Sequence, residues 1–126
     1  MHHSRLAGFI IDCKTDDLEG AAEFWSAALG FPLRARTDEP HAKYRQLLTA
    51  ADEPHIEVQQ VQHESRVHLD IESDDIEAEV RRLESLGARR LQNVQTWVVM
   101  EAPTGQRFCV VRPQRPALQS SKYERK

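Results

Sequence analysis

The feature that most constrains the fold of this chain is an internal repeat. Ile10–Glu19, which reads IIDCKTDDLE, returns 58 residues later as His68–Glu77, which reads HLDIESDDIE. Four acidic positions are identical between the copies, and most of the other changes are conservative. Each copy combines the end of an apolar strand with the start of a helix. The repeat therefore predicts a duplicated α/β unit.

The residues after each copy predict the same helix. Asp16 and Asp74 are the expected N-caps, and Gly30 and Gly87 the expected left-handed stops. In the first copy Glu19 is expected to reach back to the helix start, as in a capping box. Apolar residues recur between the ends at helical spacing; they are Leu18, Ala21, Ala22, Trp25, Ala28 and Leu29 in the first copy, and Ile76, Val80 and Leu83 in the second.

Three candidate strands follow each helix. They are Phe31–Arg36, Lys43–Thr49 and His55–Val61 in the first half, and Arg89–Asn93, Thr96–Glu101 and Arg107–Arg112 in the second. We therefore expect a single α+β domain over residues 1–113, made of two tandem βαβββ modules at about 6–62 and 65–113. Their strands are predicted to form a curved eight-stranded mixed sheet around a cavity. Residues 114–126 lack periodicity and are expected to be a flexible tail.

Composition narrows the range of partners. The formal charge is −3, with 17 basic and 20 acidic residues interspersed, so no nucleic-acid partner is expected. The longest apolar runs, such as Gly8–Ile11 and Trp97–Met100, are strand-sized, so no membrane segment is expected. Cys13 and Cys109 lie in separate strand-like segments, which is typical of reduced thiols in a cytoplasmic protein.

Three segments resemble the vicinal oxygen chelate superfamily, which includes glyoxalase I, bleomycin-resistance proteins and extradiol dioxygenases. They are the first helix at Asp16–Phe31, the strand and helix start of the second module at Arg66–Glu77, and the closing hairpin at Trp97–Val111. The resemblance is greatest to uncharacterised glyoxalase-like domain proteins. It implies the two-module fold, a homodimer, and a ligand held between the strands.

The resemblance also implies where metal ligands would stand. The ligand position in the first strand falls on Ile10, which cannot coordinate a metal, and its equivalent in the second module falls on His68. Glu57 is placed at a glutamate position, and Cys109 stands where the last strand would carry another. The usual set of two histidines and a carboxylate is therefore not assembled. A divalent metal stays an option but is not the preferred reading.

Each candidate residue has a functional and a structural interpretation. His68 can be a metal ligand or a base, or a histidine hydrogen-bonded inside the sheet. Asp12 and Asp70 can hold a cation or a cationic ligand group, although a shared structural role suits a duplicated scaffold better. Glu57 can be a ligand or general base, or lie on a solvated strand face. Cys109 can be a soft metal ligand or a nucleophile, although a small buried apolar role is more common.

Trp97 either stacks on a planar ligand or packs under a helix. The remaining internal histidines, His41, His55 and His63, are expected at the surface. His2 and His3 are not assigned to a site, because they can be either native or part of a tag.

We consider three functions. The first is a glyoxalase-like protein with lyase or isomerase chemistry on a small polar metabolite, using His68 and Glu57. The second is a non-enzymatic binder that sequesters a drug or metabolite, as bleomycin-resistance proteins do; Ile10 favours this one. The third is a metal enzyme with an altered ligand set that adds Cys109 and either Asp12 or Asp70.

Overall fold

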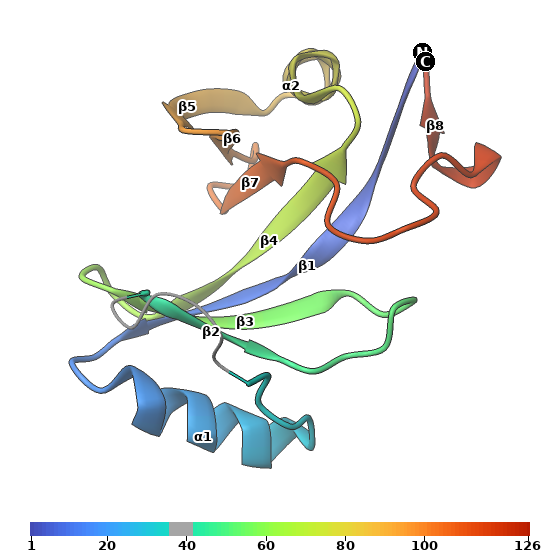
Figure 1. The fold of residues 1–126 in the computed structure, drawn as a ribbon. Coiled ribbons are helices and arrows are strands. Elements are labelled where there is room, and N and C mark those ends of the chain that lie inside the picture. Colours follow the sequence, from blue (N-terminus) through green and yellow to red (C-terminus); the bar gives the residue numbers. More distant parts are fainter. Residues whose placement is uncertain (36–41) are drawn as a thin grey trace. The chain divides into compact units, whose positions relative to one another are not determined.

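The computed structural model describes residues 1–35 and 42–126, so Arg36 and His41 lie outside the described part. Two α-helices and eight strands make up its main elements (Figure 1). In chain order they are β1 (His2–Lys14), α1 (Leu18–Leu29), β2 (Tyr44–Leu47), β3 (His55–Val61), β4 (Arg66–Ser73), α2 (Ile76–Ser85), β5 (Arg89–Val94), β6 (Trp97–Glu101), β7 (Arg107–Val111) and β8 (Glu124–Arg125).

The strands form one mixed sheet in the order β2-β3-β1-β4-β7-β6-β5, with β8 added beside β1. The β1–β3 and β4–β7 pairs are parallel, whereas β2–β3, β5–β6 and β6–β7 are antiparallel. The predicted α+β class with an eight-stranded mixed sheet is therefore confirmed. The second module has the full βαβββ order. In the first module, the described part of the segment predicted at Phe31–Arg36 forms only an isolated bridge between Leu33 and Leu47.

The chain divides into two compact units, and the division crosses β1 and β4. Unit 1 contains Met1–Ala7 and His68–Lys126, and unit 2 contains Gly8–Val67. In unit 1, α2 packs on β6 and β7 around a core of five buried residues, namely Val80, Leu83, Val98, Met100 and Val110. In unit 2, α1 packs on β3 through Leu18, Ala22 and Val58. The middle of each helix therefore buries the apolar face that its sequence periodicity predicts. At the end of α1, Ala28 and Leu29 of the predicted stripe are instead exposed.

The helix starts differ from the prediction by one residue in both copies. The N-cap of α1 is Asp17, whose carboxylate accepts from the Gly20 N–H, and that of α2 is Asp75, which accepts from Ala78. Asp74 instead accepts hydrogen bonds from the His3 backbone N–H and ring. The adjacent aspartates are both acceptable caps by residue type, and backbone geometry selects the second. Gly30 and Gly87 both adopt positive φ after their helices, as expected.

Buried charges hold both ends of the chain in unit 1. Glu72 is fully buried and accepts hydrogen bonds from the side chains of Arg5 and Arg115. The backbone N–H groups of Gln114 and Arg115 donate to the same carboxylate. Arg5 also donates to the carbonyls of Arg115 and Pro116. The start of β1 is thereby connected through β4 to the segment that follows β7.

The C-terminal segment, expected to be a flexible tail over residues 114–126, contains a buried side chain and two short elements. Leu118 is 1% exposed, a short 3-10 helix spans Ser121–Tyr123, and β8 pairs antiparallel with the first residues of β1. The two chain ends consequently lie side by side (Figure 1). Periodicity does not reveal this packing, because it depends on isolated long-range contacts and not on a regular element. The predicted module and domain boundaries remain expectations.

Candidate functional site

Three titratable side chains gather on one face of the sheet in unit 1. The alternation of β4 places His68 and Asp70 on one face, whereas Ile71 on the other face packs against the core beneath α2. Cys109 lies on the neighbouring strand β7, where the parallel register pairs it with Asp70. Three residues on two adjacent strands therefore come together without any contribution from a loop.

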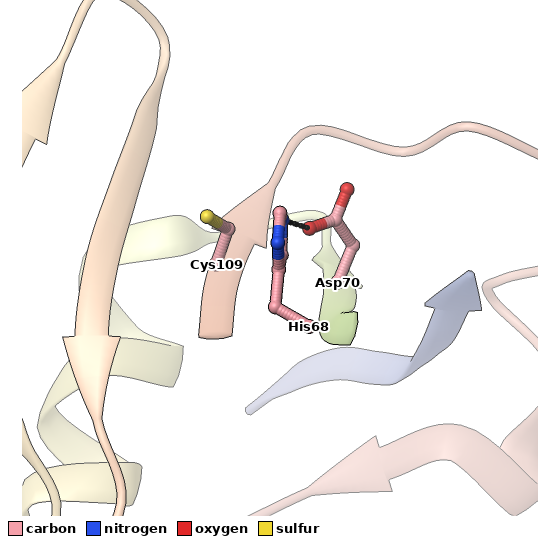
Figure 2. A group of neighbouring side chains, drawn as sticks. All are labelled: His68, Asp70 and Cys109. Atoms are coloured by element: carbon pink, nitrogen blue, oxygen red, sulfur yellow. Dashed lines mark ion pairs between the residues drawn. The ribbon is translucent and has the colours of Figure 1, made fainter. Parts of the chain in front are cut away.

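The three side chains are close enough to act on the same small group. One ligand atom from each of His68, Asp70 and Cys109 lies within 4.8 Å of the others. The Nε2 atom of His68 is 3.5 Å from Oδ1 of Asp70, and this ion pair is drawn in Figure 2. The two side chains are 15% and 20% exposed, and Cys109 is half-buried. A partly dry environment of this kind strengthens interactions between charges.

The carboxylate of Asp70 is incompletely satisfied. Its Oδ1 atom is buried and accepts no hydrogen bond from the residues that the structure describes. Its separation from the His68 ring is longer than a normal hydrogen bond. A buried polar atom without a hydrogen bond costs stability.

Trp97 lies on the same side of unit 1 as Cys109. Val99 is the register partner of Cys109, and Trp97 is two residues before Val99 on β6, so the two share its face. The indole is half-buried and belongs to neither of the apolar clusters described above. It stands on the face of β6 opposite to Val98 and Met100, which pack beneath α2.

The remaining predicted site residues belong to unit 2. Ile10 is 4% exposed and pairs in register with Glu57 on the parallel strand β3. Asp12 is 2% exposed, lies 3.9 Å from the Nε of Arg66, and pairs with Gln59. Glu57 is half-buried. Of the predicted residues, His68, Asp70 and Cys109 are thus brought together within one unit, whereas Glu57, Asp12 and Ile10 lie in the other.

Cys13, the other cysteine of the chain, lies outside this group of side chains. Cys13 packs beside the core of unit 2, and burial raises the pKa of its thiol, an effect that the Asp12 carboxylate reinforces and a hydrogen bond with Trp25 opposes. A thiol held protonated in this way is a poor ligand and nucleophile. Its packing is therefore that of a core residue.

The sequence reasoning missed a second cluster of polar residues, around Glu79. Its carboxylate is fully buried and bonds to His2 at 2.8 Å and to Arg82 at 2.7 and 2.8 Å. Burial acts to raise the pKa of Glu79, but hydrogen bonds from Arg82, His2 and Ser4 bring it below its usual value. The available signal was the position of Glu79 beside the apolar stripe of α2. Because all of its charges are paired, we regard this cluster as structural.

Only some of the positions that the family resemblance implies for metal ligands carry a side chain with a donor atom. Ile10 offers no donor atom, whereas His68 and Cys109 both do, and Asp70 adds a carboxylate between the two strands. The buried Oδ1 of Asp70, which lacks a hydrogen bond within the described residues, suits a cation ligand. The residues present therefore fit a three-ligand set within unit 1.

A duplicated βαβββ scaffold with polar side chains on the open face of its sheet defines the vicinal oxygen chelate class of proteins. The chain belongs to the glyoxalase-like domain family, whose sequence model matches residues 8–111. No curated protein sequence matches the chain. No helix in the described residues is long and apolar enough to cross a bilayer.

Solved structures support the same fold at low sequence identity. A hypothetical protein from Bacillus halodurans C-125 is similar with a TM-score of 0.63 and 13% identity, over 90% of this chain and 97% of that one. Methylmalonyl-CoA epimerase from Mycobacterium tuberculosis has a TM-score of 0.59 and 19% identity, with 86% and 87% covered. A methylmalonyl-CoA epimerase in complex with methylmalonyl-CoA and NH4+ has a TM-score of 0.58 and 16% identity, with 94% and 99% covered.

Proposed function

We propose that this protein binds a small polar organic molecule at the face carrying His68, and that it catalyses an isomerase- or lyase-type proton transfer on it. The observation that carries the proposal is the pairing of His68 with Asp70 beside Cys109 on adjacent strands. An imidazole titrates near neutral pH, so it can both take and return a proton. Two of the similar structures are methylmalonyl-CoA epimerases, a kind of enzyme that agrees with chemistry of this kind.

In this proposal four side chains have separate roles. His68 takes a proton from a carbon next to a carbonyl group and returns it to the same or a neighbouring atom. Asp70 orients the ring and stabilises the imidazolium that forms, as a carboxylate paired with a histidine does in other enzymes. Glu57, a second carboxylate of the protein, is a candidate for the second proton-transfer group. Trp97 is a candidate surface for a planar part of the ligand.

The test is deuterium exchange from D2O into methylmalonyl-CoA and a panel of other carbonyl-containing metabolites. We expect incorporation at the carbon next to the carbonyl for at least one compound. Because general acid–base catalysis supplies about 10²–10⁴-fold, His68→Ala should slow that exchange by about the same factor while ligand affinity changes far less. Ile10→Val, at the equivalent position of the first copy, is the matched control and should leave exchange unchanged.

The second candidate function is sequestration of a drug or metabolite without chemistry, as in bleomycin-resistance proteins. Ile10 favours it, because a protein that only binds its ligand has no need of a donor at that position. If a panel compound binds tightly and is recovered without deuterium, the result supports sequestration and contradicts catalysis. Exchange at the wild-type rate in His68→Ala would remove His68 from the mechanism.

We also propose that the protein acts as a cytoplasmic homodimer. Both cysteines are free thiols, as in proteins of reducing compartments. The strand order ends at β2 and β5, whose outer edges are places where another chain can pair or pack. A monomer mass in light scattering at micromolar concentration would contradict the dimer.

A further inference from the structure

We propose that Cys109 is a covalent nucleophile for α,β-unsaturated carbonyl compounds, and that its reversible addition to them converts their conjugated double bond between the cis and trans forms. The inference rests on the proposed function, because it gives His68 the same proton transfer at the carbon next to the carbonyl group. It adds a substrate class and a second reacting group. The side chains concerned all come from the paired strands β4 and β7 of unit 1.

Cys109 has the neighbours that activate a thiol. One ring nitrogen of His68 and one carboxylate oxygen of Asp70 lie within 4.8 Å of its sulfur. A thiol becomes a strong nucleophile when an adjacent base takes its proton, and that base is in turn oriented by a third group. Asp70 supplies the third group, since its Oδ1 atom lies 3.5 Å from Nε2 of His68. Figure 2 shows the imidazole between the thiol and the carboxylate.

The spacing of the thiol and the imidazole suits two adjacent carbon atoms of a substrate. Reacting atoms in a productive complex stand about 3–3.5 Å apart. A sulfur and a nitrogen that lie no more than 4.8 Å from one another can therefore each approach one end of the same carbon–carbon double bond. In this arrangement His68 faces the α-carbon, as in the proposed function, and Cys109 faces the β-carbon.

Proton transfer at the α-carbon selects the β-carbon as the point of attack. A thiol beside this histidine can attack either neighbour of the α-carbon, namely the carbonyl carbon or the β-carbon. Attack on the carbonyl carbon creates no need for a proton at the α-carbon. Attack on the β-carbon moves the π electrons into an enolate, whose α-carbon accepts a proton from a positioned acid. Only attack on the β-carbon therefore uses both Cys109 and His68.

Trp97 is a further reason to expect a planar, conjugated substrate. It stands two residues before Val99, the register partner of Cys109, and on the same face of β6. Two residues along a strand span about 7 Å, so the indole lies near a group attached to the double bond. A conjugated carbonyl compound is flat and packs well against an aromatic ring.

The reaction balances without an oxidant, a reductant or a second substrate. His68 takes the proton of the Cys109 thiol, and the sulfur forms a bond to the β-carbon as the carbon–carbon π bond breaks. His68 then gives the proton to the α-carbon of the enolate. The bond between the α- and β-carbons is single in this adduct and rotates. In the reverse steps His68 removes a proton from the α-carbon and the carbon–sulfur bond breaks, which restores the thiol and releases the isomer.

The experiment incubates the purified full chain in D2O with monomethyl maleate, a cis compound whose double bond is conjugated to two carbonyl groups. Proton NMR follows its conversion to monomethyl fumarate. We expect conversion to be faster than with free cysteine at the same concentration, and the product to carry deuterium on an alkene carbon.

A second probe locates the reactive thiol in the wild-type protein. Acrylamide forms a stable thiol adduct, and peptide mass mapping shows which cysteine carries it. We expect Cys109 to be labelled faster than Cys13, which packs beside the core of unit 2 and whose thiol pKa is raised by burial.

Variants assign the conversion to the two reacting groups. Cys109→Ser should abolish it, because a hydroxyl is a far weaker nucleophile than a thiol. His68→Ala should slow it by about 10²–10⁴-fold, the factor that general acid–base catalysis supplies. Cys13→Ala is the matched thiol control and should convert the probe at the wild-type rate. Far-ultraviolet circular dichroism checks that each variant is folded.

Several outcomes would overturn the inference. They are conversion no faster than with free cysteine, labelling of Cys13 in preference to Cys109, and undiminished conversion in Cys109→Ser. Transfer of the acyl group of a saturated thioester to Cys109 would also overturn it, in favour of attack at the carbonyl carbon. The proposed function fails separately, because deuterium exchange into saturated carbonyl compounds measures it. Exchange without conversion contradicts only this inference, and conversion without exchange contradicts only the proposed reaction on saturated compounds.

Discussion

The two copies of the repeat carry the same aspartate in different surroundings. In the first copy, Asp12 is 2% exposed, has the apolar Ile10 two residues before it on β1, and pairs in register with Gln59. In the second copy, Asp70 is 20% exposed on its side chain, follows His68, and pairs with Cys109. The two copies thus share the strand position and its carboxylate. They differ in the residues around it, since only the second copy places a histidine and a cysteine beside the aspartate.

The strand registers show how far this difference extends. Ile10 pairs with Glu57 on β3, so the residue that corresponds to Cys109 by register is Gln59 and not Glu57. Glu57 and Cys109 are thus not equivalent points of the two modules. A duplicated scaffold consequently does not guarantee a duplicated site, and each copy has to be examined through its own strand pairing.

The units also differ in how they are stabilised. Unit 2 has an apolar core beneath α1, whereas unit 1 adds two fully buried carboxylates, Glu72 and Glu79, which bond to arginine and histidine side chains. At the positions that correspond to these carboxylates, the first copy has Lys14 and Ala21. Buried charge is therefore a property of the second copy alone at these positions.

The largest effect on stability is expected from Glu72→Ala. The substitution leaves Arg5 and Arg115 buried without their common carboxylate, and breaking a buried ion pair in this way costs about 3–5 kcal/mol. Lys14→Ala, its counterpart in the first copy, removes only an exposed ion pair with Glu64 and should cost at most about 1 kcal/mol. Urea unfolding measures both. Equal losses would contradict the contrast between the units.

A smaller and equal effect is expected at the two helix starts. Asp17→Ala and Asp75→Ala each remove a side-chain acceptor for a backbone N–H, which typically costs about 1 kcal/mol. The same denaturant measurement should give similar losses for both, because the capping geometry is one of the features that the copies share. Asp16→Ala, one residue before the α1 cap, should have little effect, and a loss equal to that of Asp17→Ala would argue against Asp17 as the cap.

The smallest effect is expected from Asp74, and it depends on pH. Burial acts to raise the pKa of Asp74, but hydrogen bonds from the backbone and ring of His3 lower it below its usual value. A depressed pKa stabilises the fold above the unfolded value of about 3.9, and this contribution is lost as pH falls through the folded pKa. Asp74→Asn should therefore flatten the acid limb of the stability curve.

Asp16→Asn is the control for this pH effect. The substitution changes the corresponding residue of the first copy, which is exposed. It should leave the acid limb of the stability curve as it is in the wild type. The free energy of unfolding measured between about pH 2 and 6 covers the relevant range. An acid limb in Asp74→Asn identical to that of the wild type would rule out the contribution of the His3 contact.

Much of the fold could be predicted because it rests on local and periodic signals. The repeat, the helical spacing after Leu18 and Ile76, and the strand alternation that puts His68 and Asp70 on one face are all properties of short segments. The helix starts were displaced by one residue because two neighbouring aspartates have the same capping ability. The packing of the C-terminal segment could not be predicted, because Leu118 and Arg115 make isolated long-range contacts that leave no periodic pattern in the sequence.

By itself, the sequence determined the duplicated α+β scaffold and the faces on which His68, Asp70 and Cys109 stand, because side-chain direction follows from strand periodicity. Only the tertiary structure decided that Cys109 pairs with Asp70 and that Glu72 joins both ends of the chain. Register between distant strands, and the pairing of buried charges, depend on contacts between residues tens of positions apart. The chemistry proposed for His68 depends on those contacts.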